Sequence, residues 1–259
     1  MGCAYPARLP IPMPVSGSIS LMTYNVDSDH AANDETLRAI EESNVDLVFL
    51  QEVSAAWQAS LRSRLTSIYP QQVYRGDDGY AAGVAILSKW PIIWVEELPR
   101  IDWFPAIRAI LQTPIGPLQV LDVHLRPPRS PGGSYLLGHF STRPIREREI
   151  RSYAAALEPG IRTVIAGDFN EGDHGRAVRW LKHLGYHNAL PEFAPHATTW
   201  RWPIGVITLR ARYDHIFYDG ASAVLYAAVR EAGRSDHLPV IVVLAPSSAY
   251  GNEQREARQ

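Results

Sequence analysis

Six short segments of the chain place polar side chains at the end of an apolar run. Their carboxylate and amide oxygens suit a hard cation, and their histidines suit a general base. Each segment alone is weak evidence, because a polar residue that closes a strand is usually a turn former or a helix cap. Strand ends that meet at one rim, however, are where α/β folds build their sites. The six segments are Thr23–Asp27, Leu50–Val53, Val123–Leu125, Gly167–Asn170, Tyr213–Ile216 and Ser235–Pro239.

The elements that position these segments are short apolar runs that alternate with helical patterns. Many strands with few helices indicate two sheets packed face to face with helices outside, an α/β fold built as a two-layered β-sandwich flanked by helices. Residues 126–141 are rich in proline and glycine and are expected to form a long loop. Helices are expected at Asp34–Ser43, Ser54–Leu65, Thr142–Leu157 and His174–Leu184. Strands are expected at Ser18–Tyr24, Val45–Leu50, Ala82–Ser88, Ile92–Leu98, Ile107–Thr113, Leu118–Leu125, Thr163–Gly167, Arg212–Tyr218, Ala223–Arg230 and Leu238–Leu244.

The composition is that of a globular protein with a sizeable core. Of the 259 residues 46% are apolar and 20% are charged, which excludes disorder, collagen and coiled coil as descriptions of the whole chain. No low-complexity linker divides the chain. We therefore expect one domain over residues 18–246, with a flexible arm at 1–17 and a disordered tail at 247–259.

Charge and cysteine content narrow the class of partner. The net charge of −2 argues against a surface coated with basic groups for long duplex DNA, although a local basic patch remains open. The single cysteine, Cys3, allows no intramolecular disulfide and suits a reducing compartment, so a cytoplasmic location is expected. The longest apolar stretch, Leu238–Ala245, is far short of the ~20 residues that cross a bilayer, so no stable membrane insertion is expected.

The order and spacing of the six segments resemble the endonuclease/exonuclease/phosphatase superfamily of DNase I-like phosphoesterases, and most of all its compact bacterial members. The most specific motifs are Gly-Asp-Phe-Asn at 167–170 and Ser-Asp-His at 235–237. Asn25 and Gln51-Glu52 stand at the positions in the chain that the family pattern expects for them. The resemblance runs from about Ser18 to Leu244. It implies a four-layer α/β/β/α fold and a metal-dependent phosphoric diester hydrolase.

The resemblance also implies a metal site. Glu52 is similar to the family's principal ligand of Mg²⁺ or Mn²⁺, with Ca²⁺ as a further candidate. Asn25, Asp27 and Asp236 are expected near the ion or its waters. Such a sparse set is adequate, because Mg²⁺ usually keeps several waters and takes few protein carboxylates.

The catalytic roles implied by the resemblance fall on five residues. His237 is expected to be the base that takes a proton from the attacking water, with Asp214 as the carboxylate that orients its ring. Asp168 is expected to position the nucleophile or serve the leaving oxygen, and which of Asp168 and His237 is the base stays open. Asn170 and His124 are expected to donate to the phosphoryl oxygens.

The substrate is less well defined by the sequence. Candidate substrate-binding residues are Arg126, His139 and Arg143 in an arginine-rich segment, and the indoles of Trp103 and Trp200. The chain lacks evident basic insertions for gripping duplex DNA, so the predicted activity is a phosphodiesterase for a small or flexible substrate. Two alternatives remain: a nuclease acting on single-stranded or damaged nucleic acid, and a catalytically silent binding module of the same fold. The oligomeric state is left open.

Overall fold

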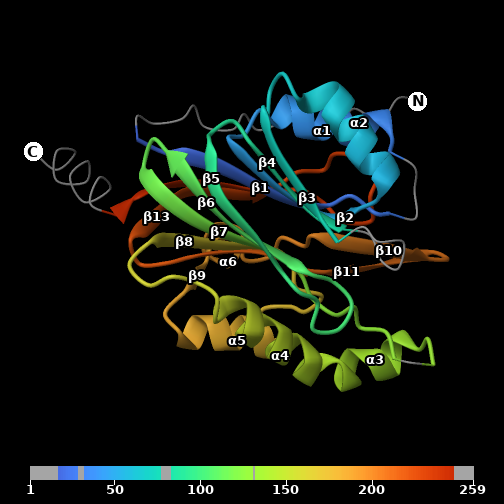
Figure 1. Ribbon diagram of the computed structural model, residues 1–259. Helices are drawn as coiled ribbons and strands as arrows, with labels where there is room; N and C mark the ends of the chain where they lie inside the picture. Colours follow the sequence, from blue (N-terminus) through green and yellow to red (C-terminus); the bar gives the residue numbers. More distant parts are fainter. Residues whose placement is uncertain (1–16, 29–31, 77–82, 131, 248–259) are drawn as a thin grey trace, which may run out of the picture.

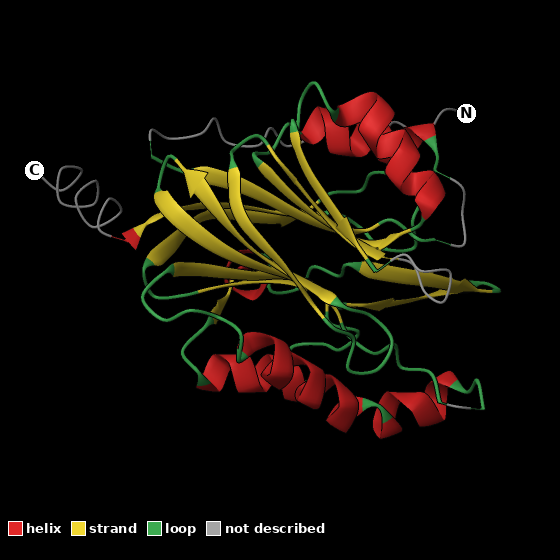
Figure 2. Ribbon diagram, viewed as in Figure 1, coloured by secondary structure: helices red, strands yellow, loops and turns green. Residues whose placement is uncertain are grey.

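Two β-sheets lie face to face, and helices cover the outer face of each (Figures 1 and 2). The computed structural model describes residues 17–28, 32–76, 83–130 and 132–247. The predicted β-sandwich flanked by helices is therefore confirmed. No helix within the described ranges is long and apolar enough to span a membrane.

The first sheet holds the strands that carry Asn25 and Glu52 at their ends. Strand β1 runs parallel to β2 and antiparallel to β14, so the chain's first and last described strands lie side by side. In spatial order its six strands are β13 (Ser222–Val229), β14 (Val240–Pro246), β1 (Ile19–Asn25), β2 (Leu47–Val53), β4 (Gly83–Ser88) and β3 (Gln71–Arg75).

The second sheet carries His124, Asp168 and Asp214. Strand β7 runs parallel to β8, and β12 runs antiparallel to β8 on its other side. In spatial order its six strands are β5 (Ile92–Leu98), β6 (Ala106–Thr113), β7 (Gly116–His124), β8 (Arg162–Asp168), β12 (Asp214–Tyr218) and β9 (His187–Asn188).

A separate two-stranded hairpin, β10 (Trp200–Ile204) and β11 (Ile207–Ala211), extends beyond the sandwich (Figure 1). Helices α1 and α2 cover the first sheet, and α4 and α5 lie along the outer face of the second, with α3 next to α4, while α6 contacts β12 and β13. The helices are α1 (Asp34–Ser43), α2 (Ala55–Leu65), α3 (Tyr135–Ser141), α4 (Arg143–Ala154), α5 (Arg176–His183) and α6 (Ala189–Phe193).

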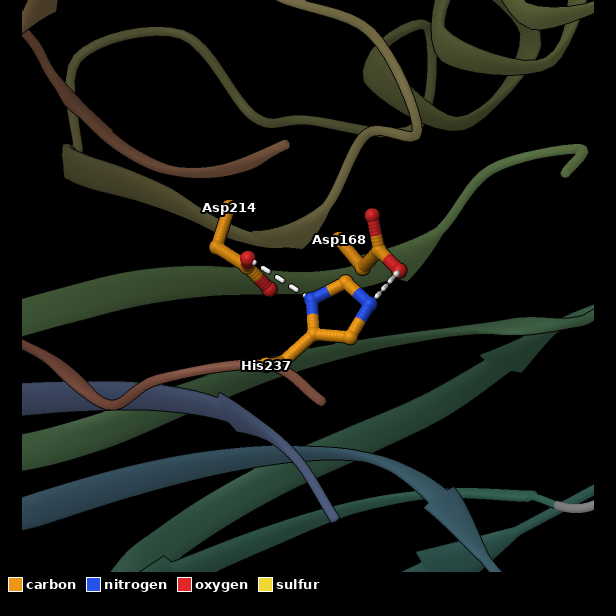
Figure 3. Close-up of side chains that lie close together, drawn as sticks. All are labelled: Asp168, Asp214 and His237. Atoms are coloured by element: carbon orange, nitrogen blue, oxygen red, sulfur yellow. Dashed lines mark hydrogen bonds and ion pairs between the residues drawn. The ribbon is translucent and has the colours of Figure 1, made fainter. Parts of the chain in front are cut away.

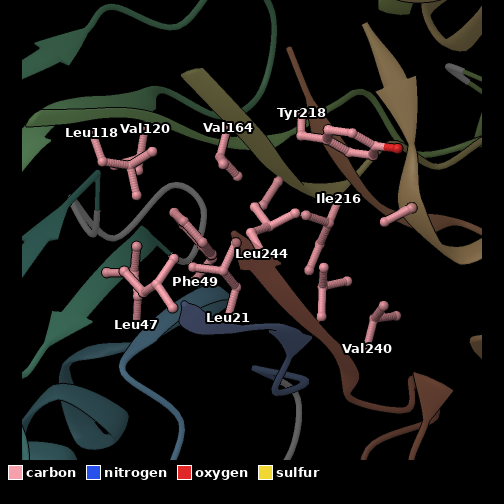
Figure 4. Close-up of a cluster of buried hydrophobic side chains, with 14 of the residues drawn as sticks. Leu21, Leu47, Phe49, Leu118, Val120, Val164, Ile216, Tyr218, Val240 and Leu244 are labelled. Atoms are coloured by element: carbon pink, nitrogen blue, oxygen red, sulfur yellow. The ribbon is translucent and has the colours of Figure 1, made fainter. Parts of the chain in front are cut away.

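Three apolar layers hold the sandwich together. The central one lies between the sheets, where Leu21 and Phe49 of the first sheet join Val120 and Ile216 of the second (Figure 4). The other two bury the inner faces of α1 and α2 against the first sheet, and of α4 and α5 against the second. Because all three layers are fully buried, the rim that carries the polar strand ends is held on a rigid frame.

Strand register brings three of the predicted site residues into one row. His124 of β7 is paired with Asp168 of β8, which is paired in turn with Asp214 of β12. Paired residues on neighbouring strands point to the same face of a sheet. In the first sheet, Asn25 is paired with Gln51, directly before Glu52. The carboxyl ends of both parallel pairs therefore meet at one rim.

Helices α1 and α2 lie within the ranges predicted for them, whereas several other elements were not predicted. Asn33 and Ser54 cap α1 and α2 and accept hydrogen bonds from Thr36 N and Trp57 N. The loop predicted for residues 126–141 is wrong over Tyr135–Ser141, where α3 forms after the cap Ser134. The pattern missed β3, β9, α6 and the β10–β11 hairpin, which are short, polar or exposed.

Candidate active site

His237 lies between two buried carboxylates (Figure 3). Its Nδ1 is 2.8 Å from Oδ2 of Asp214, and its Nε2 is 3.6 Å from Oδ2 of Asp168. The main-chain N–H of His237 donates to Oγ of Ser235, which fixes the turn just before β14. The ring is thus held by Asp214 on one side and directs its other nitrogen toward Asp168.

Burial and the charges of its neighbours shift the pKa of His237 in opposite directions. Burial lowers the pKa of His237, but the carboxylates of Asp214 and Asp168 outweigh it and raise that pKa well above its usual value. Burial raises the pKa of Asp168 to about 6, with the charge of His237 opposing the shift and that of Asp214 adding to it. Each group therefore affects the other, because the charge of His237 lowers the pKa of Asp168 and the charge of Asp168 raises the pKa of His237.

Glu52 is held as an ionised carboxylate on the opposite sheet. Its Oε1 accepts from Nδ2 of Asn25 at 3.0 Å, and its Oε2 accepts from both N and Oγ of Ser28 at 3.1 and 3.0 Å. Burial raises the pKa of Glu52, but the imidazole of His124 and these donors outweigh it, so the pKa lies below its usual value. Glu52 also has a φ of +61°, a left-handed conformation. This conformation interrupts the regular alternation of side chains between the two faces of β2.

His124 points its ring into the same space from the second sheet. Its Nε2 is 3.5 Å from Oδ2 of Asp168 and 4.0 Å from Oε1 of Glu52. Burial lowers the pKa of His124, and the charges of Asp168 and Glu52 oppose this shift. Within the described part of the chain neither ring nitrogen has a hydrogen-bond partner. A buried imidazole with two free nitrogens is available to a ligand.

The ring of His124 is fixed by an aromatic contact rather than by hydrogen bonds. Phe104, in the loop between β5 and β6, stacks on it with ring centroids 3.7 Å apart and planes 10° from parallel. Nothing in the sequence around Phe104 indicated this contact, because no periodic pattern ties the loop to β7.

Asn170 sits where β8 turns into the following loop. Its main-chain N donates to Oδ1 of Asp168 at 2.8 Å, and its Nδ2 donates to the carbonyl of Leu125 at 3.0 Å. The turn requires a left-handed φ of +51° at Asn170, which asparagine tolerates better than most residues. One amide hydrogen of Nδ2 is engaged by Leu125, which leaves the second for a ligand.

Asp236 and Asp27 complete the acidic rim. Asp236 accepts a 2.8 Å bond from Nε1 of Trp200, so this indole acts as a donor to the site. Burial raises the pKa of Asp236, the charge of His237 lowers it, and the nearby charges of Asp27 and Glu52 add to the increase. Asp27 donates its main-chain N to Oδ1 of Asn25 at 3.0 Å.

The donor set at this rim fits a divalent cation. The charges of Asp27 and Glu52 raise the pKa of Asp236, and no lysine or arginine within the described residues forms an ion pair with Glu52 or Asp236. Carboxylate oxygens beside an amide oxygen match the ligand preference of Mg²⁺ and related hard cations.

A second group of potential ligand atoms surrounds His237 itself. One ligand atom each from Asp168, Asp214 and His237 lies within 4.8 Å of the other two. The short bond from Nδ1 of His237 to Asp214 already uses one of these pairs, so this group has the geometry of an oriented imidazole.

The predicted substrate-binding residues lie in different surroundings. Arg126 is buried, with its guanidinium 3.8 Å from the centre of the Trp103 ring and Nη1 3.1 Å from Asp102. Arg143 begins α4, with its guanidinium 5.1 Å from the ring centre of Phe140. The side chain of His139 lies outside the described residues. Trp200 bonds directly to the acidic rim, through Asp236.

Three further residues hold the site in place. Oγ1 of Thr199 accepts the main-chain N–H groups of Tyr213 and Asp214, both at 3.0 Å. Oδ1 of Asp122 accepts from Nε2 of Gln51 at 2.7 Å, which joins the two sheets beneath the rim. Ser28, already described, holds Glu52. Ser28 directly follows the Thr23–Asp27 segment and Thr199 directly precedes the predicted Trp200, whereas Asp122 was not predicted.

Two sheets packed face to face, with imidazoles, amides and carboxylates at the ends of their parallel strands, define the DNase I-like class of phosphoesterase folds. The chain belongs to the Endonuclease/Exonuclease/phosphatase family, whose sequence profile matches residues 22–237. Members of this family generally use divalent metals.

Solved structures with the same fold span most of this chain. An endonuclease/exonuclease/phosphatase from Beutenbergia cavernae is 19% identical over 89% of this chain and 72% of its own, with a TM-score of 0.69. TDP2 from D. rerio, solved with a single-strand DNA product, is 19% identical over 88% of this chain and 98% of its own, with a TM-score of 0.70. ANGEL2, a 2′,3′-cyclic phosphatase solved with adenosine-2′,3′-vanadate, is 16% identical over 90% of this chain and 97% of its own, also with a TM-score of 0.70. A search of curated proteins found no match.

Proposed function

We propose that this protein is a divalent-metal-dependent phosphodiesterase that hydrolyses its substrate by in-line attack of water. The observation that carries the proposal is the arrangement of His237. Its Nδ1 is bonded to Asp214, and its Nε2 faces Asp168 beside the carboxylate of Glu52. An oriented imidazole beside a group of carboxylates is the pairing that metal-assisted phosphoester hydrolysis requires.

Glu52, with Asn25, Asp27 and Asp236, would hold the cation, which supplies Lewis-acid stabilisation of charge on the phosphoryl group. His237 is the proposed base, and Asp214 would keep its Nδ1 protonated so that Nε2 can accept a proton from the attacking water. His124, with both ring nitrogens free, and Asn170, with one free amide hydrogen, are the proposed donors to the phosphoryl oxygens.

One observation favours a second assignment of the base. A raised pKa keeps the proton on His237, and a protonated imidazole donates rather than accepts. In that case Asp168, whose pKa is raised to about 6, takes the proton from water, and His237 protonates the leaving oxygen.

For the substrate we propose a small or flexible phosphodiester, with single-stranded nucleic acid as the second candidate. The neighbours' ligands support both, since one was solved with a single-strand DNA product and another with an adenosine-2′,3′-vanadate. The net charge of −2 favours substrates that do not need an extended basic surface.

The experiment is hydrolysis of bis(p-nitrophenyl) phosphate by metal-stripped protein titrated with Mg²⁺ and with Mn²⁺. Wild-type protein is compared with Glu52→Ala and with the control Glu97→Ala, which removes an exposed glutamate from β5. Metal-dependent turnover that is lost in Glu52→Ala and kept in Glu97→Ala supports the proposal. Turnover that survives Glu52→Ala contradicts the assigned metal site.

Absence of turnover with either metal is resolved by calorimetry of metal binding. Binding without turnover points to a more demanding substrate than the aryl diester. Absence of both binding and turnover overturns the enzyme proposal in favour of a silent binding module.

A further inference from the structure

A pocket of about 510 Å³ opens beside the acidic rim, between the β10–β11 hairpin and the turn at residues 234–236. Asp27 and Asp236 line its side toward the proposed metal site. The pocket is therefore continuous with the catalytic rim, and the mechanism proposed above does not use its other walls.

Three arginines line the outer part of this pocket: Arg201, Arg210 and Arg234. Arg201 pairs with Glu231 at 2.9 Å, and Arg234 lies 3.4 Å from Glu35. Arg210 is exposed and makes no ion pair within the described residues. A cluster of guanidinium groups is suited to binding an anion, above all a phosphate, when one of them, here Arg210, is not used in an ion pair within the described residues.

The hairpin also offers a flat aromatic surface. Trp202 lines the pocket and is 49% exposed, and its ring is stacked over that of Trp200 at 6.3 Å with planes 14° apart. A stacked, half-exposed indole beside arginines is a combination that binds a planar ring next to a phosphate.

Main-chain bonds fix the hairpin to the catalytic turn. Arg201 N donates to the carbonyl of Asp236 at 2.9 Å, and Leu238 N donates to the carbonyl of Thr199 at 2.7 Å. Trp200 forms an isolated antiparallel bridge with His237. A group bound in this pocket is therefore held in a fixed position relative to His237.

We propose that this pocket is a subsite for a second phosphate of the substrate, with Arg210 as its principal cation and Trp202 as the platform for an adjoining ring. The proposal rests on the proposed phosphodiesterase function and deepens it. The second phosphate has two possible sources: the neighbouring phosphate of a nucleic-acid strand, or a further phosphate of a small molecule.

The first test measures binding in the absence of metal, so it does not depend on catalysis. Thymidine 3′,5′-bisphosphate and inorganic pyrophosphate are each titrated into protein in EDTA, with tryptophan fluorescence and calorimetry as readouts. We expect Arg210→Gln to weaken binding on the order of tenfold, the cost of losing one charge-assisted hydrogen bond. The control Arg179→Gln makes the same charge change at an exposed position of α5 and should bind like wild type.

The two ligands separate the two sources. Tighter binding of the nucleotide, lost in Trp202→Leu, supports a nucleic-acid strand. Equal binding of pyrophosphate supports a small phosphorylated substrate. Binding that is the same in wild type, Arg210→Gln and Arg179→Gln overturns the subsite, as does absence of binding by both ligands.

The second test compares cleavage of the thymidine dinucleotide TpT, which has one phosphate, with that of TpTpT, which has two. We expect a higher kcat/KM for TpTpT in wild type and a ratio near one in Arg210→Gln, with the wild-type ratio kept in Arg179→Gln. A ratio that Arg210→Gln leaves unchanged overturns a nucleic-acid source. If the protein cleaves neither these substrates nor the aryl diester, the proposed function fails, while the binding test still decides the subsite.

Discussion

Asp214 and His237 come from different sheets, yet Oδ2 of Asp214 lies 2.8 Å from Nδ1 of His237. Asp214 begins β12 in the second sheet, and His237 precedes β14 in the first. Their bond spans the interface between the sheets, so the packing of the central apolar layer sets the geometry of the proposed catalytic pair. The hairpin strengthens the same link, because Thr199 holds the main chain of Asp214 while its neighbour Trp200 bridges to His237.

Asp214→Asn should lower kcat about 10³- to 10⁴-fold with little change in KM. Asparagine has the same shape, but its amide can donate to Nδ1 and so stabilise the wrong tautomer of the imidazole. Circular dichroism and the melting temperature should show a folded protein. A variant with near wild-type kcat would mean that the 2.8 Å bond does not orient a catalytic ring.

The pH–rate profiles of His237→Ala and Asp168→Asn should separate the two candidate bases. An essential base must be deprotonated, so kcat/KM rises with pH through its pKa and produces the acidic limb of the profile. We expect this limb to disappear in His237→Ala and to persist, at lower overall rate, in Asp168→Asn. The opposite pattern, with a wild-type limb near pH 6, would assign the base to Asp168, whose pKa is about 6.

The sequence predicted the sheets better than it predicted their contacts. Apolar periodicity and caps such as Asn33 act over a few residues, so strands and helix starts could be read directly from the pattern. The order of polar strand ends was sufficient to propose Glu52, Asp168 and His237 as members of one site. Family resemblance, rather than periodicity, was what raised Asp214 above a structural residue.

Residues that hold the site through distant contacts were not predictable. Phe104 stacks on His124 from the loop between β5 and β6. Asp122 accepts a hydrogen bond from Gln51 across the interface between the two sheets. Such contacts depend on how the sheets pack, which leaves no mark in the local sequence. The β10–β11 hairpin was missed for a related reason: its exposed Trp202 and Leu209 do not form the buried face that a strand pattern requires.

Phe104→Leu should lower kcat about tenfold and destabilise the fold by about 1–2 kcal/mol. Leucine retains most of the buried apolar volume but cannot stack, so the ring of His124 loses the contact that fixes its plane. Phe193→Leu, at a half-exposed position of α6, serves as the control. If kcat is unchanged in Phe104→Leu while His124→Ala is impaired, stacking is not what positions the ring.

Gly167→Ala should destabilise the protein by more than about 3 kcal/mol or prevent its accumulation in soluble form. Gly167 has a φ of +143°, and an added Cβ would lie 1.9 Å from the carbonyl oxygen of Val123. The strands β7 and β8 would have to separate directly beside His124 and Asp168. Gly172→Ala is the matched control, since its Cβ would meet only Arg212 O at 3.6 Å. Equal melting temperatures for the two variants would contradict this account.

Glu149 should make the protein less stable as the pH rises from about 4.5 to 8. Its side chain is fully buried, Oε2 accepts the N–H of Arg126, and Oε1 has no hydrogen-bond partner within the described residues. Burial raises its pKa to about 8, with Asp102 adding to the shift and Arg126 and Arg146 opposing it. The folded state binds this proton more tightly than the unfolded state does. The protonated carboxyl of Glu149 therefore adds its full contribution to the free energy of unfolding below the pKa of the unfolded state, and this contribution is lost as the pH rises through the pKa of the folded state.

The measurement is the free energy of unfolding in guanidinium chloride between pH 5 and pH 8. Other buried acids with raised pKa values, among them Asp122 and Asp168, should also lower the stability as the pH rises. The difference in the free energy of unfolding between wild type and the Glu149 variant therefore measures the effect of Glu149 alone. Between pH 5 and pH 8 the free energy of unfolding of Glu149→Gln should rise relative to that of wild type by on the order of 3 kcal/mol, because glutamine stays neutral. The control Glu147→Gln, on the same helix but partly exposed, should track wild type. A Glu149→Gln curve parallel to the wild-type curve would show that the carboxyl is ionised in the folded protein throughout this range.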